Sequence, residues 1–181
     1  MSKCCLKIYL LFVAAMLFSS CEVIFQNSIG EKSKTDKKIL GRWYGTEEND
    51  KESFIEISRK SDYQIEIKHL KSKDEEIITA STVKIGNYYY LNLSKSNKEN
   101  FIVRYKIENG ELMLWMLDTD KIGELLTQNK LKGFEKNPKT LAKTIIITDG
   151  TEKIGEFLRS PESDTAFVLL GKLKKIDETS K

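Results

Sequence analysis

Apolar and polar residues alternate with a period of two through much of residues 41–118 of this 181-residue chain. Ile55 and Ile57, for example, alternate with Glu and Ser. Successive side chains of a β-strand point to opposite faces, so this period predicts strands with one buried face. Gly86-Asn87 and Asn109-Gly110 fall between such runs and predict tight hairpin turns.

A series of about seven short strands separated by turns predicts an antiparallel meander. A meander of this length tends to close on itself, because closure removes its exposed edges. Apolar runs at residues 144–148 and 166–176 predict two further strands, the second of which closes the sheet. The expected fold is mainly β, an antiparallel up-and-down barrel in one domain over residues 39–181.

Two short helices are expected in the C-terminal third. Residues 119–131 carry leucine and isoleucine at helical spacing, and Asp118 or Thr119 is available as the N-cap. A second helix is expected after Asp149, whose side chain would cap it while Glu152 completes a capping box. We expect both helices to pack on the sheet as buttresses.

The first twenty residues differ from all that follow. Lys3 and Lys7 place positive charge at the front, and an apolar stretch at residues 8–18 leads into Ser-Ser-Cys. That order is typical of a secretory signal peptide. The apolar stretch is only about half the length that a permanent transmembrane helix needs, so residues 1–20 are expected to be removed.

The sequence Phe-Ser-Ser-Cys that ends at Cys21 resembles the lipobox of bacterial lipoproteins. The resemblance implies a diacylglyceryl group on the Cys21 sulfur, cleavage before Cys21 and acylation of the new amino group. Several acyl chains together hold a protein on a membrane stably. Glu22 stands where the best-known inner-membrane retention signal has aspartate, which favours the outer membrane. The alternative is an ordinary secretory signal followed by an incidental thiol.

Residues 21–38 are predicted to form a flexible tether, because most of them are polar. Cys4 and Cys5 leave with the signal peptide, so Cys21 is the mature chain's remaining cysteine and no disulfide is expected. Loss of Lys3 and Lys7 lowers the basic count from 30 to 28 against 27 acidic residues, a balance of +1. Such a balance gives no sign of nucleic-acid binding.

Catalytic chemistry is not indicated. His69 is the chain's single histidine, which excludes a histidine-rich metal site. Its position continues the alternation of Ile65 and Ile67, so we expect it on the inner face near a strand end, most simply as a packed side chain. The chain is therefore interpreted as a non-enzyme without a cofactor.

The segment Leu-Gly-Arg-Trp-Tyr-Gly at residues 40–45 resembles the Gly-X-Trp signature that opens lipocalins and related barrels. The resemblance implies that Gly41 and Trp43 form the opening motif, that Trp43 closes one end of the barrel, and that an arginine from the other end of the chain packs near it. Arg159 is the one arginine late in the sequence, and it falls in a segment expected to be helical.

Aromatic residues are the better indication of function. Candidate ligand contacts, besides His69, are Tyr88, Tyr90, Tyr105 and Trp115, since amphipathic rings often line cavities for apolar ligands. The competing interpretation is that they only fill the barrel. Two functions remain open, a membrane-anchored barrel that binds a small hydrophobic or amphipathic ligand, and a solid envelope barrel that acts through an unidentified protein partner.

Overall fold

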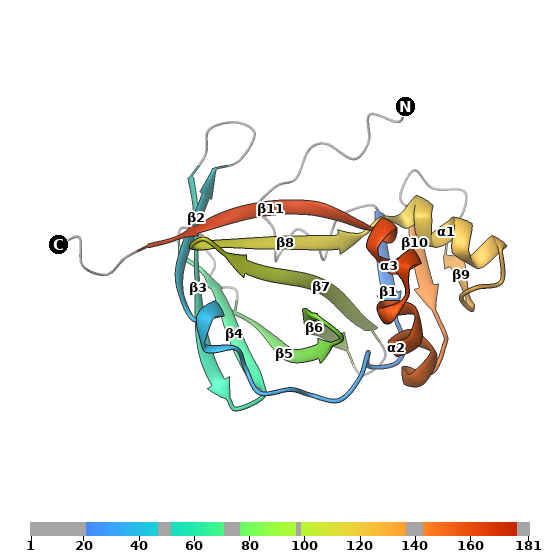
Figure 1. The fold of residues 1–181 in the computed structure, drawn as a ribbon, viewed down its shortest axis with the longest axis horizontal. Coiled ribbons are helices and arrows are strands. Elements are labelled where there is room, and N and C mark those ends of the chain that lie inside the picture. The colour runs from blue at the N-terminus through green and yellow to red at the C-terminus, as the bar shows by residue number, and fades with distance from the viewer. Residues whose placement is uncertain (1–20, 47–51, 71–76, 97–98, 137–142, 177–181) are drawn as a thin grey trace.

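The computed structural model describes residues 21–46, 52–70, 77–96, 99–136 and 143–176. The predicted signal peptide, residues 1–20, lies outside the described residues. In the described part of the chain, eight antiparallel strands form a closed barrel (Figure 1). The strands are β2 (Gly41–Thr46), β3 (Glu52–Ser61), β4 (Gln64–His69), β5 (Ile77–Ile85), β6 (Tyr88–Ser96), β7 (Glu99–Glu108), β8 (Glu111–Leu117) and β11 (Phe167–Lys175).

The barrel is a simple meander in its first seven strands. Strands β2 to β8 follow one another in chain order, and β11 returns to pair with both β8 and β2. Pairing of β6 with β7 completes the ring. Asn109 and Gly110 adopt φ of 52° and 77°, the two positive values that a tight type I′ hairpin requires. The predicted antiparallel up-and-down barrel is confirmed.

A three-stranded extension continues the sheet beyond β7. Strand β1 (Cys21–Phe25) lies parallel to β10 (Lys143–Ile147), and β9 (Gly133–Lys136) pairs with the far side of β10. Phe25 joins the extension to the barrel by pairing with Asn100 of β7.

The N-terminal segment therefore differs from the flexible tether predicted for residues 21–38. Val23, Ile24 and Phe25 are buried in β1, and Ile29 has no exposed surface. Beyond them the backbone is held to the barrel, because the Ser33 amide donates to Thr82 at 2.8 Å. The few apolar residues of this segment are enough to pack it against the rest of the domain, although its composition is polar overall.

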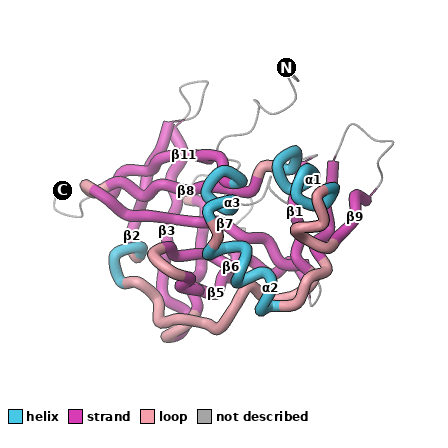
Figure 2. Tube along the Cα trace, turned by 45° about the vertical axis from the view of Figure 1, so that its right-hand side comes forward, coloured by secondary structure: helices cyan, strands magenta, loops and turns pink. Residues whose placement is uncertain are grey.

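Helices cover one side of the barrel wall and of the three-stranded extension. They are α1 (Thr119–Thr127), α2 (Thr151–Arg159) and α3 (Pro161–Ala166), and a single 3₁₀ turn, η2 (Lys37–Ile39), precedes β2. Figure 2 shows α2 and α3 crossing in front of the strands and α1 lying beside β1 and β9. The two predicted helices are present, and α3 is an additional short one.

The two predicted helix starts differ in their capping. Asp118 caps α1, its Oδ1 accepting the Asp120 amide at 2.8 Å, as predicted. The capping box predicted at Asp149 is wrong, because α2 begins after Gly150 without a side-chain cap. The Asp149 carboxylate instead accepts the Lys132 amide at 2.6 Å. It therefore ties the start of α2 to the segment that leads into β9.

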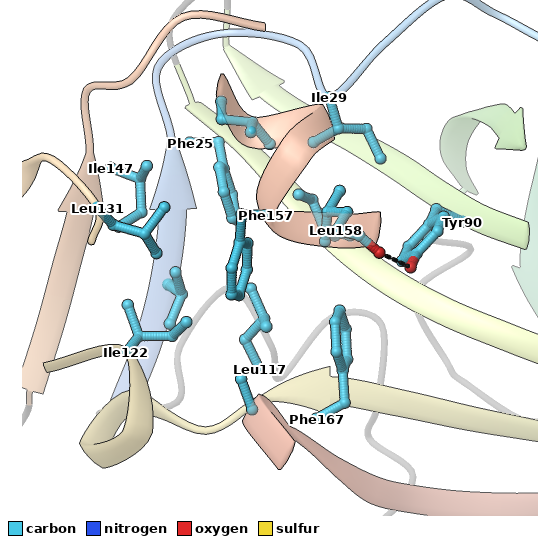
Figure 3. Packing of buried hydrophobic residues seen from close by; sticks show 14 of the residues in the cluster. Phe25, Ile29, Tyr90, Leu117, Ile122, Leu131, Ile147, Phe157, Leu158 and Phe167 are labelled. Atoms are coloured by element: carbon cyan, nitrogen blue, oxygen red, sulfur yellow. Dashed lines mark hydrogen bonds between the residues drawn. The ribbon is translucent and has the colours of Figure 1, made fainter. Parts of the chain in front are cut away.

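Two separate apolar cores result from this arrangement. The first lies inside the barrel and includes Trp43, Ile65 and Leu112. The second lies outside the barrel, between its wall and the helices with the three-stranded extension. Figure 3 shows Phe157 of α2 between Phe25 and Leu117 in this outer core.

Candidate functional site

Trp43 lies inside the barrel near the end at which β2 begins. Its side chain is fully buried, and its indole Nε1 donates to the carbonyl of Ile39 at 2.8 Å. Ile39, the last residue of η2, is also fully buried and packs in the barrel core. We call this end the closed end.

A lysine occupies the place of the arginine that the lipocalin resemblance implies. Lys175 Nζ, from the last strand, lies 5.4 Å from the centre of the Trp43 ring. Gly41 adopts φ of +125°, and a Cβ there would come within 3.1 Å of the Lys175 side chain. Both features favour glycine at position 41. Arg159, by contrast, is exposed on α2 and lies away from the barrel core.

Tyr105 is the candidate ligand contact that faces the barrel core most fully. It is 1% exposed, belongs to the barrel cluster, and its ring centre lies 5.5 Å from that of Tyr89. Its hydroxyl is buried and has no hydrogen-bond partner among the described residues. Burial, followed by the charges of Asp36 and Tyr89, raises the pKa of Tyr105 well above its usual range. The hydroxyl is therefore neutral and can donate or accept one hydrogen bond.

His69 also faces the interior, but at the other end. It lies opposite Ile55 in the β3–β4 register, and directly opposed residues share a face. Strands β4 and β7 run in opposite directions around the meander. His69, the last residue of β4, is consequently far from Tyr105, which lies near the end of β7.

The other three candidates lie on the outer face of the barrel wall. Tyr88, Tyr90 and Trp115 all contact the outer core. The structure therefore does not bring the five candidate residues into one cavity. It places His69 and Tyr105 inside the barrel and groups the other three around Arg104, which the sequence analysis did not single out.

Arg104 is a buried cation surrounded by rings. Its guanidinium carbon lies 4.5 Å from the centre of the Tyr88 ring, 5.4 Å from that of Trp115 and 4.4 Å from that of Phe167. Its side chain is 8% exposed, and its Nη1 donates to Asp164 Oδ1 of α3 at 2.8 Å. The sequence signal for this site was a charged residue inside the otherwise apolar and aromatic run Phe-Ile-Val-Arg-Tyr at residues 101–105.

Tyr90 lies beside this cluster and gives a prediction for alkaline pH. Burial raises the pKa of Tyr90 from 10.0 to about 12, although Arg104 acts in the opposite direction. A pKa raised in the folded state means that the neutral form stabilises folding at pH below 10.0 and that this stabilisation is lost as pH rises towards 12. Stability measured by urea denaturation should fall over that interval, and Tyr90→Phe should reduce the fall. An identical pH dependence in the variant would contradict this assignment.

Among the described residues, no three histidine, cysteine, aspartate or glutamate residues are grouped so that they could hold a metal ion. Within the same residues, no helix combines the length and apolarity needed to cross a bilayer.

Comparison with known proteins gives no relative. No protein-family model, curated protein sequence or solved structure matches the chain.

Proposed function

We propose that this chain is a bacterial lipoprotein, anchored through acyl chains on Cys21, whose barrel binds a small apolar or amphipathic molecule. The lipobox-like sequence at residues 18–21 supports the anchor. Glu22 follows the cysteine at the position where the best-known inner-membrane retention signal has aspartate, and this supports the outer membrane. Because β1 begins at Cys21, the anchor would join the folded domain without an intervening spacer. The domain would then lie close to the bilayer surface.

The buried hydroxyl of Tyr105 is the observation that carries the ligand proposal. A buried polar group without a partner costs about 1–3 kcal/mol, so native proteins normally satisfy it. The barrel core around Tyr105 is apolar, with Leu112 and Leu173 among its members. A molecule with an apolar body and one polar atom would match this environment.

Tyr105→Phe tests the ligand proposal. In residues 21–181 carrying Cys21→Ser, the uncharged dye N-phenyl-1-naphthylamine should bind with enhanced fluorescence. The Phe variant should bind it about three- to tenfold more weakly, which is the net value of one hydrogen bond. Without ligand the variant should be as stable as the parent protein, because it loses only an unsatisfied group.

Tyr89→Phe is the matched control. Tyr89 lies on the next strand with its ring against Tyr105, but it is only half-buried. This variant should bind the dye as the parent protein does. Equal affinity in the parent and both variants, or no binding at all, would contradict a ligand at Tyr105.

A second candidate function is a filled barrel that acts through a protein partner in the envelope. Complete burial of Trp43, Ile65 and Leu112 in one continuous cluster favours it. Cross-linking in intact cells that recovers one reproducible partner, combined with absence of any barrel ligand, would support this function.

A further inference from the structure

The Arg104 cluster has the composition of an anion-binding site. A guanidinium that is 8% exposed needs a negative partner, because a buried unpaired charge is costly. The rings of Tyr88, Trp115 and Phe167 surround it within 5.4 Å and exclude water from it. Arginine presents five donors, and the Nε of Arg104 is buried without a hydrogen-bond partner in the part of the chain that the structure describes.

The partner that balances this charge is held less firmly than the arginine. Asp164 is 53% exposed and contacts Nη1 of Arg104. It belongs to α3, a helix of six residues whose start has no side-chain cap. Solvent therefore reaches the carboxylate while the guanidinium stays buried. Any group that replaces Asp164 must itself be an anion.

We propose that Arg104 and the rings around it form a second binding site, on the outer wall of the barrel, for a small amphipathic oxyanion, and that Asp164 occupies this site as an internal competitor. The oxyanion is a carboxylate or a phosphate monoester, since both match the guanidinium geometry. Its apolar part would lie on Tyr88 and Trp115, which are half-buried and border the ion pair. The site is independent of the ligand proposed for the barrel interior.

The chain's two tryptophans allow the two sites to be told apart. Trp115 lies in the Arg104 cluster, whereas Trp43 lies in the barrel core. In residues 21–181 carrying Cys21→Ser, dodecanoate or dodecyl phosphate below its micellar concentration should shift the indole resonance of Trp115 in a ¹⁵N-correlated NMR spectrum. Dodecanol, which carries no charge, should leave the Trp115 resonance unchanged. A shift of the Trp43 resonance would instead report binding in the barrel interior.

Asp164→Asn is the decisive variant, because it removes the competing charge at an exposed position. Affinity for the oxyanion should rise about tenfold, as expected when an internal competitor is lost. Glu162→Gln is the matched control, since it removes another α3 carboxylate, one that pairs with Lys130 at 3.3 Å. That control should bind with the affinity of the parent protein.

Arg104→Lys keeps the positive charge but loses the planar guanidinium with its paired N–H donors. This variant should bind the oxyanion at least about tenfold more weakly than the parent protein. A purely structural ion pair would give a different pattern, in which Asp164→Asn loses stability without any gain in affinity. That pattern would overturn the proposal. So would a Trp115 resonance that neither oxyanion shifts, or one that dodecanol shifts equally.

Discussion

Cys21→Ser is expected to move the protein out of the detergent-extractable membrane fraction, or to leave it held by an uncleaved signal peptide. The substitution removes the thiol to which the lipid would be attached, and the acyl chains provide the membrane affinity. The barrel should still fold, because β1 draws its buried contacts from Val23, Ile24 and Phe25. Labelling of cells with a fatty-acid probe, followed by fractionation, measures both effects.

Cys4→Ser and Cys5→Ser are the controls, since both cysteines lie in the predicted signal peptide. Each should be labelled and fractionated like the wild type. Absence of label from the wild type, with an unchanged distribution of the Cys21→Ser protein, would contradict lipidation.

Trp43→Ala should lower the free energy of unfolding by about 3–5 kcal/mol, the usual range for a large core aromatic. The ring is fully buried at the closed end, and its loss would also remove the hydrogen bond to Ile39 and the contact with Lys175. Urea denaturation of residues 21–181 carrying Cys21→Ser measures the change.

Two other variants separate the closing role of Trp43 from simple loss of size. Trp43→Phe keeps a ring and should lose clearly less stability than Trp43→Ala. Tyr63→Ala, at a side chain that is 43% exposed, should change stability by less than about 0.5 kcal/mol. A Trp43→Ala protein as stable as the Tyr63→Ala protein would show that Trp43 does not close the barrel.

The barrel could be predicted from the sequence because its strands are short and clear turn signals separate them. Hairpins at Asn109-Gly110 and Gly86-Asn87 appear where turn chemistry predicts them. The return of the chain through β11 followed from a late apolar run. Local signals of this kind do not depend on the rest of the structure.

The inner and outer faces of the strands were harder to predict. In β6, Tyr89 faces the barrel core and Tyr90 faces the outer core, so both faces are apolar. The alternation shows which residues share a face of the strand. It does not show which face points into the barrel, because a second core outside the barrel makes both faces apolar. The candidate residues were divided between two sites for this reason.

Long-range partners were not predictable from composition. Residues 21–38 were predicted to form a tether because most of them are polar. Their sequence does not show that β1 pairs with the distant strand β10. Asp149 has the spacing of a helix cap, but the Lys132 amide, supplied by tertiary structure, takes its carboxylate. The residue beside Trp43 is Lys175 of the last strand rather than the expected arginine, because Arg159 is held on α2.

The most direct test of the ligand-binding barrel is native mass spectrometry of residues 21–181 carrying Cys21→Ser, exported to the envelope behind a cleavable secretory signal peptide and purified without detergent. The proposal predicts a population with one added small molecule, and Tyr105→Phe should carry less of it than Tyr89→Phe. A single mass equal to that of the polypeptide, in the parent protein and in both variants, would contradict the proposal and favour a filled barrel.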